Sequence, residues 1–354
     1  MQYGLFSLMT QRDRATTPRE LYANMVEHVK MAEAIGFDTA WFAEHHFSNY
    51  CVSPSPITVA TYLAPQTSRI RLGTAVIVVP LYHTLRMLED LAVLDVVSGG
   101  RAVIGLGSGY QQYEFHKFGV ELGHARDILL ETLDVLEQFL TSGRVAYDGK
   151  HIRISETFFS VRPLQARPEI YIAGLANDPV TQRRVAENGW IPIVTTGWST
   201  LEQIGKVRDA ITKANPLASG DKKRAPFAMQ RYVYVTGDRN EALQAAEGAR
   251  YIRRIALAMR NNVARLDGAY LQEQPAPDEP PLDEIADRLL VGPAEHVAEK
   301  LAREIEALDP RHISCFMAIP GMPQRNVLAS MERFGAKVMP MVERARREPV
   351  ASTA

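Results

Sequence analysis

Residues 70–106 read IRLGTAVIVVPLYHTLRMLEDLAVLDVVSGGRAVIGL, and they contain one strand–helix–strand unit. The β-branched run at 70–79 predicts a buried strand, and apolar residues at helical spacing predict a helix at 84–97. The serine and two glycines at 98–100 end that helix, and 101–106 predicts the next strand. Two strands joined by a helix are typical of a parallel sheet, so the stretch predicts an α/β fold.

The same alternation extends in both directions along the chain. Further helices are expected at 20–35, 55–64 and 125–140, and the strands expected over the whole chain are 3–7, 38–43, 70–79, 101–106, 170–173, 191–194, 227–235 and 313–318. Strands separated by helices in this order predict a closed (β/α)₈ TIM barrel. A doubly wound open sheet is the alternative that the pattern allows.

The length of the chain exceeds what a plain barrel needs. The chain has 354 residues, whereas such a barrel takes about 250, so we expect one barrel domain at 1–345 with insertions and a C-terminal tail at 346–354. The largest insertion, 238–285, combines a helical stretch with a loop rich in proline and acidic residues. Because an insertion after a strand lies on the C-terminal face of a barrel, we expect a lid there; a solvated surface loop is the alternative. A small hairpin is expected at 144–154, with Asp148-Gly149 as its turn.

Composition excludes several classes of protein. Lys+Arg number 40 and Asp+Glu 41, and this balance disfavours a nucleic-acid binder or a protein of anionic membrane surfaces. The two cysteines, Cys51 and Cys315, are too few for a disulfide scaffold or a four-cysteine zinc site. No basic leader precedes an apolar stretch, and no apolar run approaches the ~20 residues that span a bilayer. We therefore expect a soluble, cytoplasmic protein.

Candidate functional residues follow the expected strands, where a barrel builds its active site. These segments are Glu44-His45-His46-Phe47, Pro80-Leu81-Tyr82-His83, Gly107-Ser108-Gly109-Tyr110, Gly174-Leu175-Ala176-Asn177 and Thr195-Thr196-Gly197-Trp198. Histidines, small residues and aromatic residues predominate in them. Such a set suits a flat, anionic, partly aromatic ligand better than a hard metal ion.

His45 and His46 are adjacent, so they should point to opposite sides of the chain and only one can face the barrel mouth. An imidazole there could donate to an oxyanion or relay a proton; the alternative is a hydrogen-bonded histidine of the barrel rim. Zinc sites use histidines four positions apart or a converging carboxylate. Because adjacent histidines chelate poorly, no metal site is predicted.

Two further features suggest an anion site. Gly105-Leu106-Gly107-Ser108-Gly109 lacks the spacing of a dinucleotide fingerprint and no helix starts directly after it. Its glycines would still let the backbone approach a flat ring or a phosphate, or would simply form a tight bend. Arg126, in the first turn of the 125–140 helix, could hold a phosphate or be a surface charge.

Seven short motifs stand close together in residues 1–200. They are Ala43-Glu44-His45-His46-Phe47, Leu72-Gly73-Thr74-Ala75-Val76, Leu88-Glu89-Asp90, Gly99-Gly100-Arg101, the run from Gly105 to Tyr110, Glu114-Phe115 and Phe118-Gly119. In combination they resemble the luciferase-like family of flavin-dependent monooxygenases, which includes bacterial luciferase. The resemblance is weaker after residue 200, where only Gly292-Pro293-Ala294-Glu295 still matches a family motif.

The resemblance implies a TIM-barrel oxidoreductase that uses reduced flavin mononucleotide (FMN) and dioxygen. A flavin C4a-peroxide would oxygenate a small organic substrate, and His45 falls on the family's catalytic histidine. No dinucleotide-binding half is visible, so a separate NAD(P)H:flavin reductase is expected to supply the reduced FMN. Tyr82, Tyr110, Tyr113, Phe115 and Trp198 would give the substrate an apolar, aromatic pocket.

The resemblance also implies which residues bind the flavin. Arg126 matches an arginine that holds the flavin phosphate, and the amides of Gly174-Leu175-Ala176 match a loop that does the same. Thr74-Ala75 falls where the family often carries a non-prolyl cis peptide against the flavin ring, and Gly107, Ser108 and Tyr110 complete the cofactor site. Bacterial luciferase carries cysteine and arginine where this chain has Gly107 and Ser108. This departure puts light emission and an aldehyde substrate in doubt.

The sequence also allows two other functions, and it predicts an assembly of two subunits. A reductase of the same barrel that uses the deazaflavin F420 would transfer hydride, and a non-catalytic flavin-binding protein would only store the cofactor. Helices 55–64 and 84–97 have apolar residues on more than one face, and family members commonly dimerise through them, so a homodimer is expected. The residues concerned are Ile57, Val59, Tyr62, Leu63, Leu85, Leu88, Leu91, Val93 and Leu94.

Overall fold

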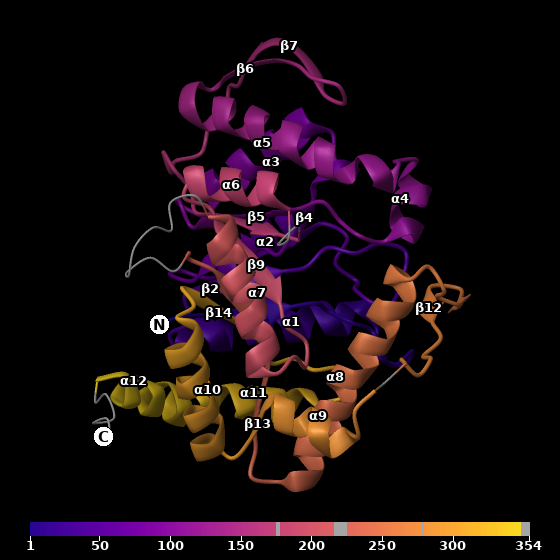
Figure 1. The fold of residues 1–354 in the computed structure, drawn as a ribbon, viewed down its shortest axis with the longest axis vertical. Coiled ribbons are helices and arrows are strands. Elements are labelled where there is room, and N and C mark those ends of the chain that lie inside the picture. Colours follow the sequence, from indigo (N-terminus) through magenta and orange to yellow (C-terminus); the bar gives the residue numbers. More distant parts are fainter. Residues whose placement is uncertain (175–177, 216–224, 278, 348–354) are drawn as a thin grey trace.

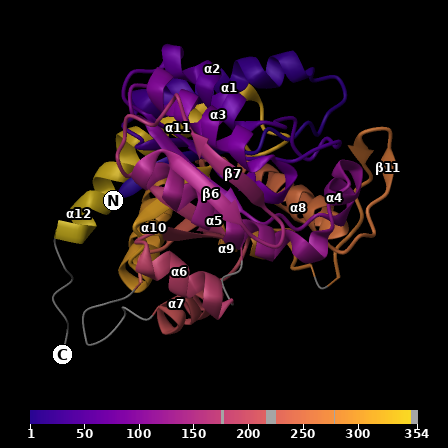
Figure 2. The same cartoon turned by 90° about the horizontal axis from the view of Figure 1, so that it is seen from above.

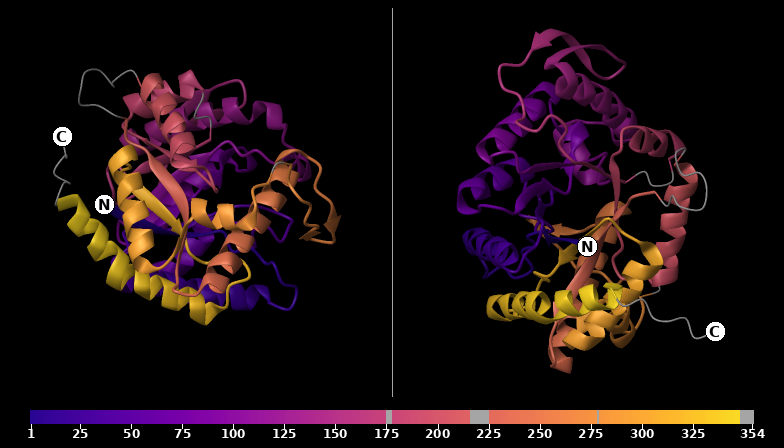
Figure 3. Two further views of the ribbon diagram at one scale, coloured as in Figure 1. Left: turned by 60° about the horizontal axis from the view of Figure 1, so that its bottom comes forward. Right: turned by 90° about the vertical axis from the view of Figure 1, so that its left-hand side faces the viewer.

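A closed barrel of eight parallel strands forms the centre of the computed structural model, which describes residues 1–174, 178–215, 225–277 and 279–347 (Figures 1 and 3). The last strand pairs with the first, so the sheet has no free edge and the barrel prediction is confirmed. In barrel order the strands are β1 (Gln2–Ser7), β2 (Thr39–Phe42), β3 (Arg71–Thr74), β5 (Ala102–Gly107), β8 (Ile170–Ala173), β9 (Ile191–Thr195), β10 (Ala228–Val235) and β14 (His312–Phe316).

Helices cover the outside of the barrel. They are α1 (Pro18–Ala34), α2 (Pro56–Leu63), α3 (Thr84–Val97), α5 (Ala125–Ser142), α6 (Pro179–Glu187), α7 (Leu201–Ala214), α10 (Ala294–Leu308), α11 (Gln324–Arg333) and α12 (Met339–Arg347). Local sequence sets their ends: Thr17 and Glu20 form a capping box at the start of α1, and Ser55 caps α2. Short 3₁₀ turns lie at Ala64–Gln66, Val79–Leu81 and Leu122–His124, and a π turn, Phe334–Val338, joins α11 to α12.

The expected strand 70–79 is interrupted. β3 ends at Thr74, the Ala75–Val76 peptide is cis, and β4 (Ile77–Val78) then pairs with β5. The resemblance placed the cis bond at Thr74–Ala75, and that position was wrong by one residue. Thr74 ends the strand because its Oγ1 donates to Gly105 O and accepts from Gly105 N, both at 2.9 Å, in place of regular ladder contacts.

A plug of large side chains fills the barrel interior. Trp41 is fully buried with Tyr171 and Val103, and its Nε1 donates to His312 Nε2 at 2.8 Å. The indole fits only because the strands beside it carry glycine: a Cβ at Gly4 would lie 2.5 Å from Trp41 Nε1. Because this layer is solid, a ligand site has to lie above it, at the carboxyl ends of the strands.

The 238–285 segment lies over those carboxyl ends. It comprises α8 (Arg239–Arg260), a hairpin of β11 (Leu266–Asp267) and β12 (Tyr270–Leu271), and α9 (Leu282–Arg288), which packs on α8. The helical stretch was expected to run from 239 to 266, and α8 ends six residues earlier, at Arg260. A second buried cluster joins Ala249, Ile252 and Ile255 of α8 to Tyr50 and Phe316 of the barrel end.

A short helix, a short strand and a hairpin complete the fold. Figure 2 shows α8 in contact with α4 (Gln112–Phe118), while β13 (Leu290–Gly292) pairs with the last residues of β10. The hairpin of β6 (Arg144–Asp148) and β7 (Arg153–Phe158) is present, but its turn spans residues 149–152 and not the two residues predicted. Glu131 of α5 accepts the backbone N–H groups of Lys150 and Ile152 and so holds the wider turn.

Candidate active site

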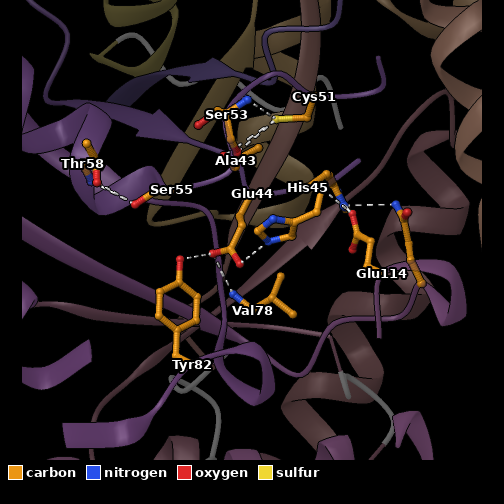
Figure 4. A network of polar contacts seen from close by, with 12 residues as sticks. Ala43, Glu44, His45, Cys51, Ser53, Ser55, Thr58, Val78, Tyr82 and Glu114 are labelled. Carbon is orange, nitrogen blue, oxygen red and sulfur yellow. Dashed lines mark hydrogen bonds and ion pairs between the residues drawn. The ribbon is translucent and has the colours of Figure 1, made fainter. Parts of the chain in front are cut away.

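The two histidines after β2 point to different carboxylates. His45 Nδ1 lies 3.0 Å from Glu114 Oε1, and His46 Nε2 lies 3.0 Å from Glu44 Oε1. Figure 4 shows the Glu44 contacts on one side of the loop and the His45–Glu114 pair on the other. Adjacent residues on extended chain diverge in this way, so each histidine belongs to its own hydrogen-bonding group.

Glu114 orients the His45 ring. Its side chain is 1% exposed, and its Oε1 also accepts the backbone N–H of His46 at 2.7 Å, so the carboxylate is fixed from two sides. A carboxylate that accepts from Nδ1 selects the tautomer with the proton there and leaves Nε2 as the nitrogen able to accept or return a proton. Gln111 Nε2 lies 3.1 Å from the same Nδ1, but an amide nitrogen only donates, so it forms no hydrogen bond with an Nδ1 that carries the proton. The geometry thus fixes the His45 ring through Nδ1 at the carboxyl end of the barrel.

Glu44 anchors the loop that carries the histidines. It is buried and accepts from His46 Nε2, from Tyr82 Oη at 2.9 Å and from Val78 N at 3.2 Å. Burial raises the pKa of Glu44, although these donors oppose the shift. The contacts tie the loop after β2 to the turn after β4, so His46 has a structural role in the protomer.

Tyrosine rings form the wall around His45. The His45 ring centroid lies 4.6 Å from that of Tyr50 and 5.8 Å from that of Tyr110, and the two tyrosines share a hydrogen bond. Burial raises the pKa of both phenols, so both stay neutral and able to donate near pH 7. A ligand beside His45 therefore meets aromatic faces and neutral hydroxyl groups.

The predicted phosphate residues gather at the ends of β5 and β8. Arg126, at the start of α5, donates to Asp178 Oδ1 at 3.0 Å and to Asp127 Oδ1 at 3.1 Å. Asp178 caps α6, which begins just beyond Gly174. Gly174 has a φ of +77°, and a Cβ there would lie 3.9 Å from Ser108 Oγ. The structure thus brings these residues to one region, and it pairs Arg126 with carboxylates that the sequence did not reveal.

The other predicted cofactor residues have more varied settings. Leu175 and Ala176 lie outside the described residues. Thr74 is fully buried with its hydroxyl committed to Gly105, so its side chain is not free to contact a ligand. Ala75 packs against the interior plug, and a Cβ at Gly107 would lie 2.7 Å from Val76 Cγ2. Glycine at 107 is therefore required by the packing of this bend.

A phosphate-bearing flavin suits the chemistry of these donors. Arg126 supplies a guanidinium that is 37% exposed, and Ser108 supplies a hydroxyl whose contact with Gly109 O is long, at 3.4 Å. Within the described part of the chain, the buried Gln111 Oε1 has no hydrogen-bond partner. Across the same residues no three metal-binding side chains converge, and no helix is long and apolar enough to cross a membrane.

The sequence did not single out three residues that shape the site. Glu114 was quoted only within a motif, and Gln111 and Tyr50 were given no role. The positions of Glu114 and Gln111 depend on α4 returning to the end of β2, and this contact joins residues 69 positions apart for His45 and Glu114. No local pattern in the sequence marks Glu114 as buried, because a glutamate is buried only where a partner is present.

The closed barrel carries a carboxylate-oriented histidine and aromatic rings at the carboxyl ends of its strands, where TIM-barrel enzymes have their active sites. The chain belongs to the luciferase-like monooxygenase family, whose family model matches residues 1–310. The membership places it among the oxidoreductases.

Sequence similarity to individual proteins is consistent with this family. An uncharacterized protein of Sinorhizobium fredii, y4vJ, is 34% identical over 98% of each chain. The alkanal monooxygenase alpha chain of the Kryptophanaron alfredi symbiont is 30% identical over 55% of this chain and 54% of its own. The oxygenase component of flavin-dependent trigonelline monooxygenase from Acinetobacter baylyi is 28% identical over 70% and 68%.

Solved structures share the fold. Monooxygenase RslO1 of Streptomyces bottropensis has a TM-score of 0.81 at 22% identity, covering 96% of this chain and 99% of its own. The oxygenating constituent of 3,6-diketocamphane monooxygenase of Pseudomonas putida, in complex with FMN, has a TM-score of 0.78 at 20% identity, with coverage of 96% and 98%. An F420-dependent secondary alcohol dehydrogenase has a TM-score of 0.72 at 16% identity, with coverage of 96% and 98%. One fold therefore serves both cofactors.

Proposed function

We propose that this chain is the oxygenase component of a monooxygenase that uses reduced FMN and dioxygen to oxygenate a small organic substrate. The observation that carries the proposal is the His45–Glu114 pair between Tyr50 and Tyr110 at the barrel mouth. The family and the flavin-dependent relative from Acinetobacter baylyi support it. When bound, reduced flavin would supply the electrons that activate dioxygen.

The residues of the chain would divide the remaining tasks. Arg126, Ser108 and the backbone at Gly174 would hold the phosphate, which favours FMN over a dinucleotide. His45 Nε2 would hold and move a proton at the reacting oxygen. The 238–285 segment would act as a lid: its α8 packs apolar side chains over the strand ends and would exclude water. We also propose a cytoplasmic protein that receives reduced FMN from a separate NAD(P)H:flavin reductase.

Cofactor titration and oxygen consumption test this function against its rivals. We expect the apoprotein to bind FMN more tightly than F420. We also expect added substrates to raise oxygen uptake above the autoxidation of reduced FMN. Preferential binding of F420 with substrate oxidation in the absence of oxygen would instead identify a hydride-transfer enzyme. Tight flavin binding without any substrate-dependent oxygen uptake would identify a storage protein.

The first prediction concerns the phosphate contact. Arg126→Ala should weaken FMN binding by roughly 10- to 150-fold, because one charge-assisted contact is worth about 1.5–3 kcal/mol. Riboflavin lacks the phosphate, so its affinity should change little. Arg144→Ala, which removes an exposed arginine paired with Glu156 on the β6–β7 hairpin, is the matched control. Equal loss of FMN and riboflavin affinity in Arg126→Ala would show a structural role and contradict the assignment.

The second prediction concerns assembly through α2 and α3, which pack side by side. Most of the apolar residues that suggested an interface are buried within the protomer, but Tyr62 and Val93 are 56% and 41% exposed. The side chains of Val96 and Val97 on α3 are likewise exposed, by 41% and 51%.

We expect a homodimer by light scattering at micromolar concentration and a monomer for Val97→Glu. Val263→Glu, at a valine 57% exposed after α8, should stay dimeric. A monomeric wild-type protein would refute this assembly.

A further inference from the structure

Arg253 and Arg260, seven positions apart on α8, have no acidic partner in the described part of the chain. Within the described residues, neither Arg253 nor Arg260 forms an ion pair, whereas Arg254 between them binds Glu273 at 2.9 Å and Glu279 at 2.7 Å. Positions seven apart lie on the same face of a helix, two turns from one another. Arg253 and Arg260 therefore share one face of α8, whereas Arg239 and Arg254 are neutralised by acidic side chains.

The unpaired arginines face aromatic rings of the barrel mouth. The Arg253 guanidinium carbon lies 5.9 Å from the ring centroid of Trp198, which follows β9. That of Arg260 lies 4.8 Å from the ring centroid of Tyr110, which follows β5. The strands before the two rings, β5 and β9, have only β8 between them in the barrel, so both arginines lie over the same side of the strand ends.

Contacts within the mouth connect these arginines to His45. The Tyr110 hydroxyl accepts from Gln111 Nε2 at 3.3 Å and shares a hydrogen bond with Tyr50, and both tyrosine rings flank the His45 ring. Arg260, stacked on Tyr110, is therefore one aromatic ring away from His45.

The charges at the mouth are unbalanced. Partial burial, followed by the nearby charge of Arg260, lowers the pKa of Arg253, so the two cations repel each other. Glu44 and Glu114, the acids near the histidines, are buried and already accept from their own partners. Two like charges beside aromatic rings and without an acid are the electrostatic complement of an anionic ring compound.

We propose that Arg253 and Arg260 bind the carboxylate of a planar aromatic acid, whose ring lies against Tyr110 and Trp198 and extends toward His45. A guanidinium matches a carboxylate through two parallel N–H donors, and the flat rings favour an aromatic body over an aliphatic one. This role for the arginines in oxygenation rests on the proposed function, whereas binding of the acid itself needs no flavin.

Calorimetric titration of the apoprotein with benzoate, and with benzamide as its neutral counterpart, tests the proposal. Benzoate should bind at least 10-fold more tightly than benzamide. In Arg253→Gln and in Arg260→Gln, benzoate affinity should fall at least 10-fold and benzamide affinity should stay the same. Arg239→Gln, at an exposed arginine of α8 paired with Asp283, should behave as wild type. Octanoate should bind more weakly than benzoate if the ring faces contribute.

The outcomes separate this inference from the proposed function. Equal binding of benzoate and benzamide, or benzoate affinity that both variants retain, would overturn the inference even if FMN binds as expected. Loss of FMN affinity in these variants, with riboflavin and benzoate affinity unchanged, would assign the arginines to the flavin phosphate and also overturn it. Arginine-dependent benzoate binding in a protein that binds no FMN would support the anion site and refute the oxygenase.

Discussion

Replacement of His45 by alanine is expected to lower product formation ~10²–10⁴-fold, the usual contribution of one positioned acid–base group. FMN binding should be retained, because the imidazole lies with Tyr50 and Tyr110 while the proposed phosphate contact is at Arg126. The release of hydrogen peroxide per reductant consumed should rise, because oxygen reduction then proceeds without delivery of oxygen to the substrate. Product mass spectrometry, a peroxide assay and FMN titration of the same preparation measure the three quantities.

His46→Ala is the matched control for that experiment. His46 is the neighbouring residue, but its ring donates to the buried Glu44, so its removal should destabilise the protein by about 1–3 kcal/mol. Flavin binding and product should then fall together with the folded fraction. If His45→Ala showed this parallel loss, His45 would be a structural residue of the rim. Normal product yield in His45→Ala would remove the proton-transfer role altogether.

The barrel could be predicted from the sequence because its signals are local. The strand at 70–79 is predicted by its β-branched run, and the helix at 84–97 by the spacing of its apolar residues and by the glycines that follow it. The order of the strands in the barrel is largely their order along the chain. The break at Thr74 was missed because it depends on the hydroxyl of Thr74 meeting Gly105, a residue 31 positions away. Nothing in the β-branched run itself indicates that a threonine hydroxyl will replace the backbone hydrogen bonds of the strand.

The candidate site was predictable in its residue types but not in its pairings. His45 was identified by its place after a strand and by resemblance, whereas its orientation depends on Glu114. Arg126 was expected to hold a phosphate or to be a surface charge, and no local pattern pointed to Asp178, 52 positions away, which lies beside it. The spacing of Arg253 and Arg260 was visible, but only the path of α8 over the mouth shows which side they face. Long-range contacts of this kind carry no local sequence pattern.

The barrel interior gives the fold its own dependence on pH. His312 is fully buried and accepts from Trp41 Nε1 at 2.8 Å, so it has to be neutral at Nε2. Burial is the main cause that lowers the pKa of His312 to about 3, and burial likewise lowers the pKa of His28 on α1 to about 4. In an unfolded chain both histidines would titrate near 6.5.

Acidification from pH 7.5 to 5 should therefore destabilise the protein well before its carboxylates are protonated. Below pH 6.5 the unfolded chain binds protons that folded His312 and His28 do not, so the free energy of unfolding falls as pH falls. Each buried histidine contributes about 1.4 kcal/mol per pH unit, or roughly 2 kcal/mol between pH 6.5 and 5. The stability that each neutral, buried histidine contributes is fully present above pH 6.5. It is lost progressively as the pH falls from 6.5 to the lowered pKa of that histidine.

Urea denaturation at several pH values, compared with His312→Gln, measures this contribution. The glutamine can accept from Trp41 through Oε1 but does not titrate, so the loss of stability between pH 6.5 and 5 should be smaller than in wild type by roughly 2 kcal/mol. His28→Gln should reduce the loss by a similar amount, and the two effects should add because α1 and the barrel interior are separate sites. A wild-type pH dependence in His312→Gln would mean that His312 is not the neutral acceptor on which Trp41 and the closed barrel depend.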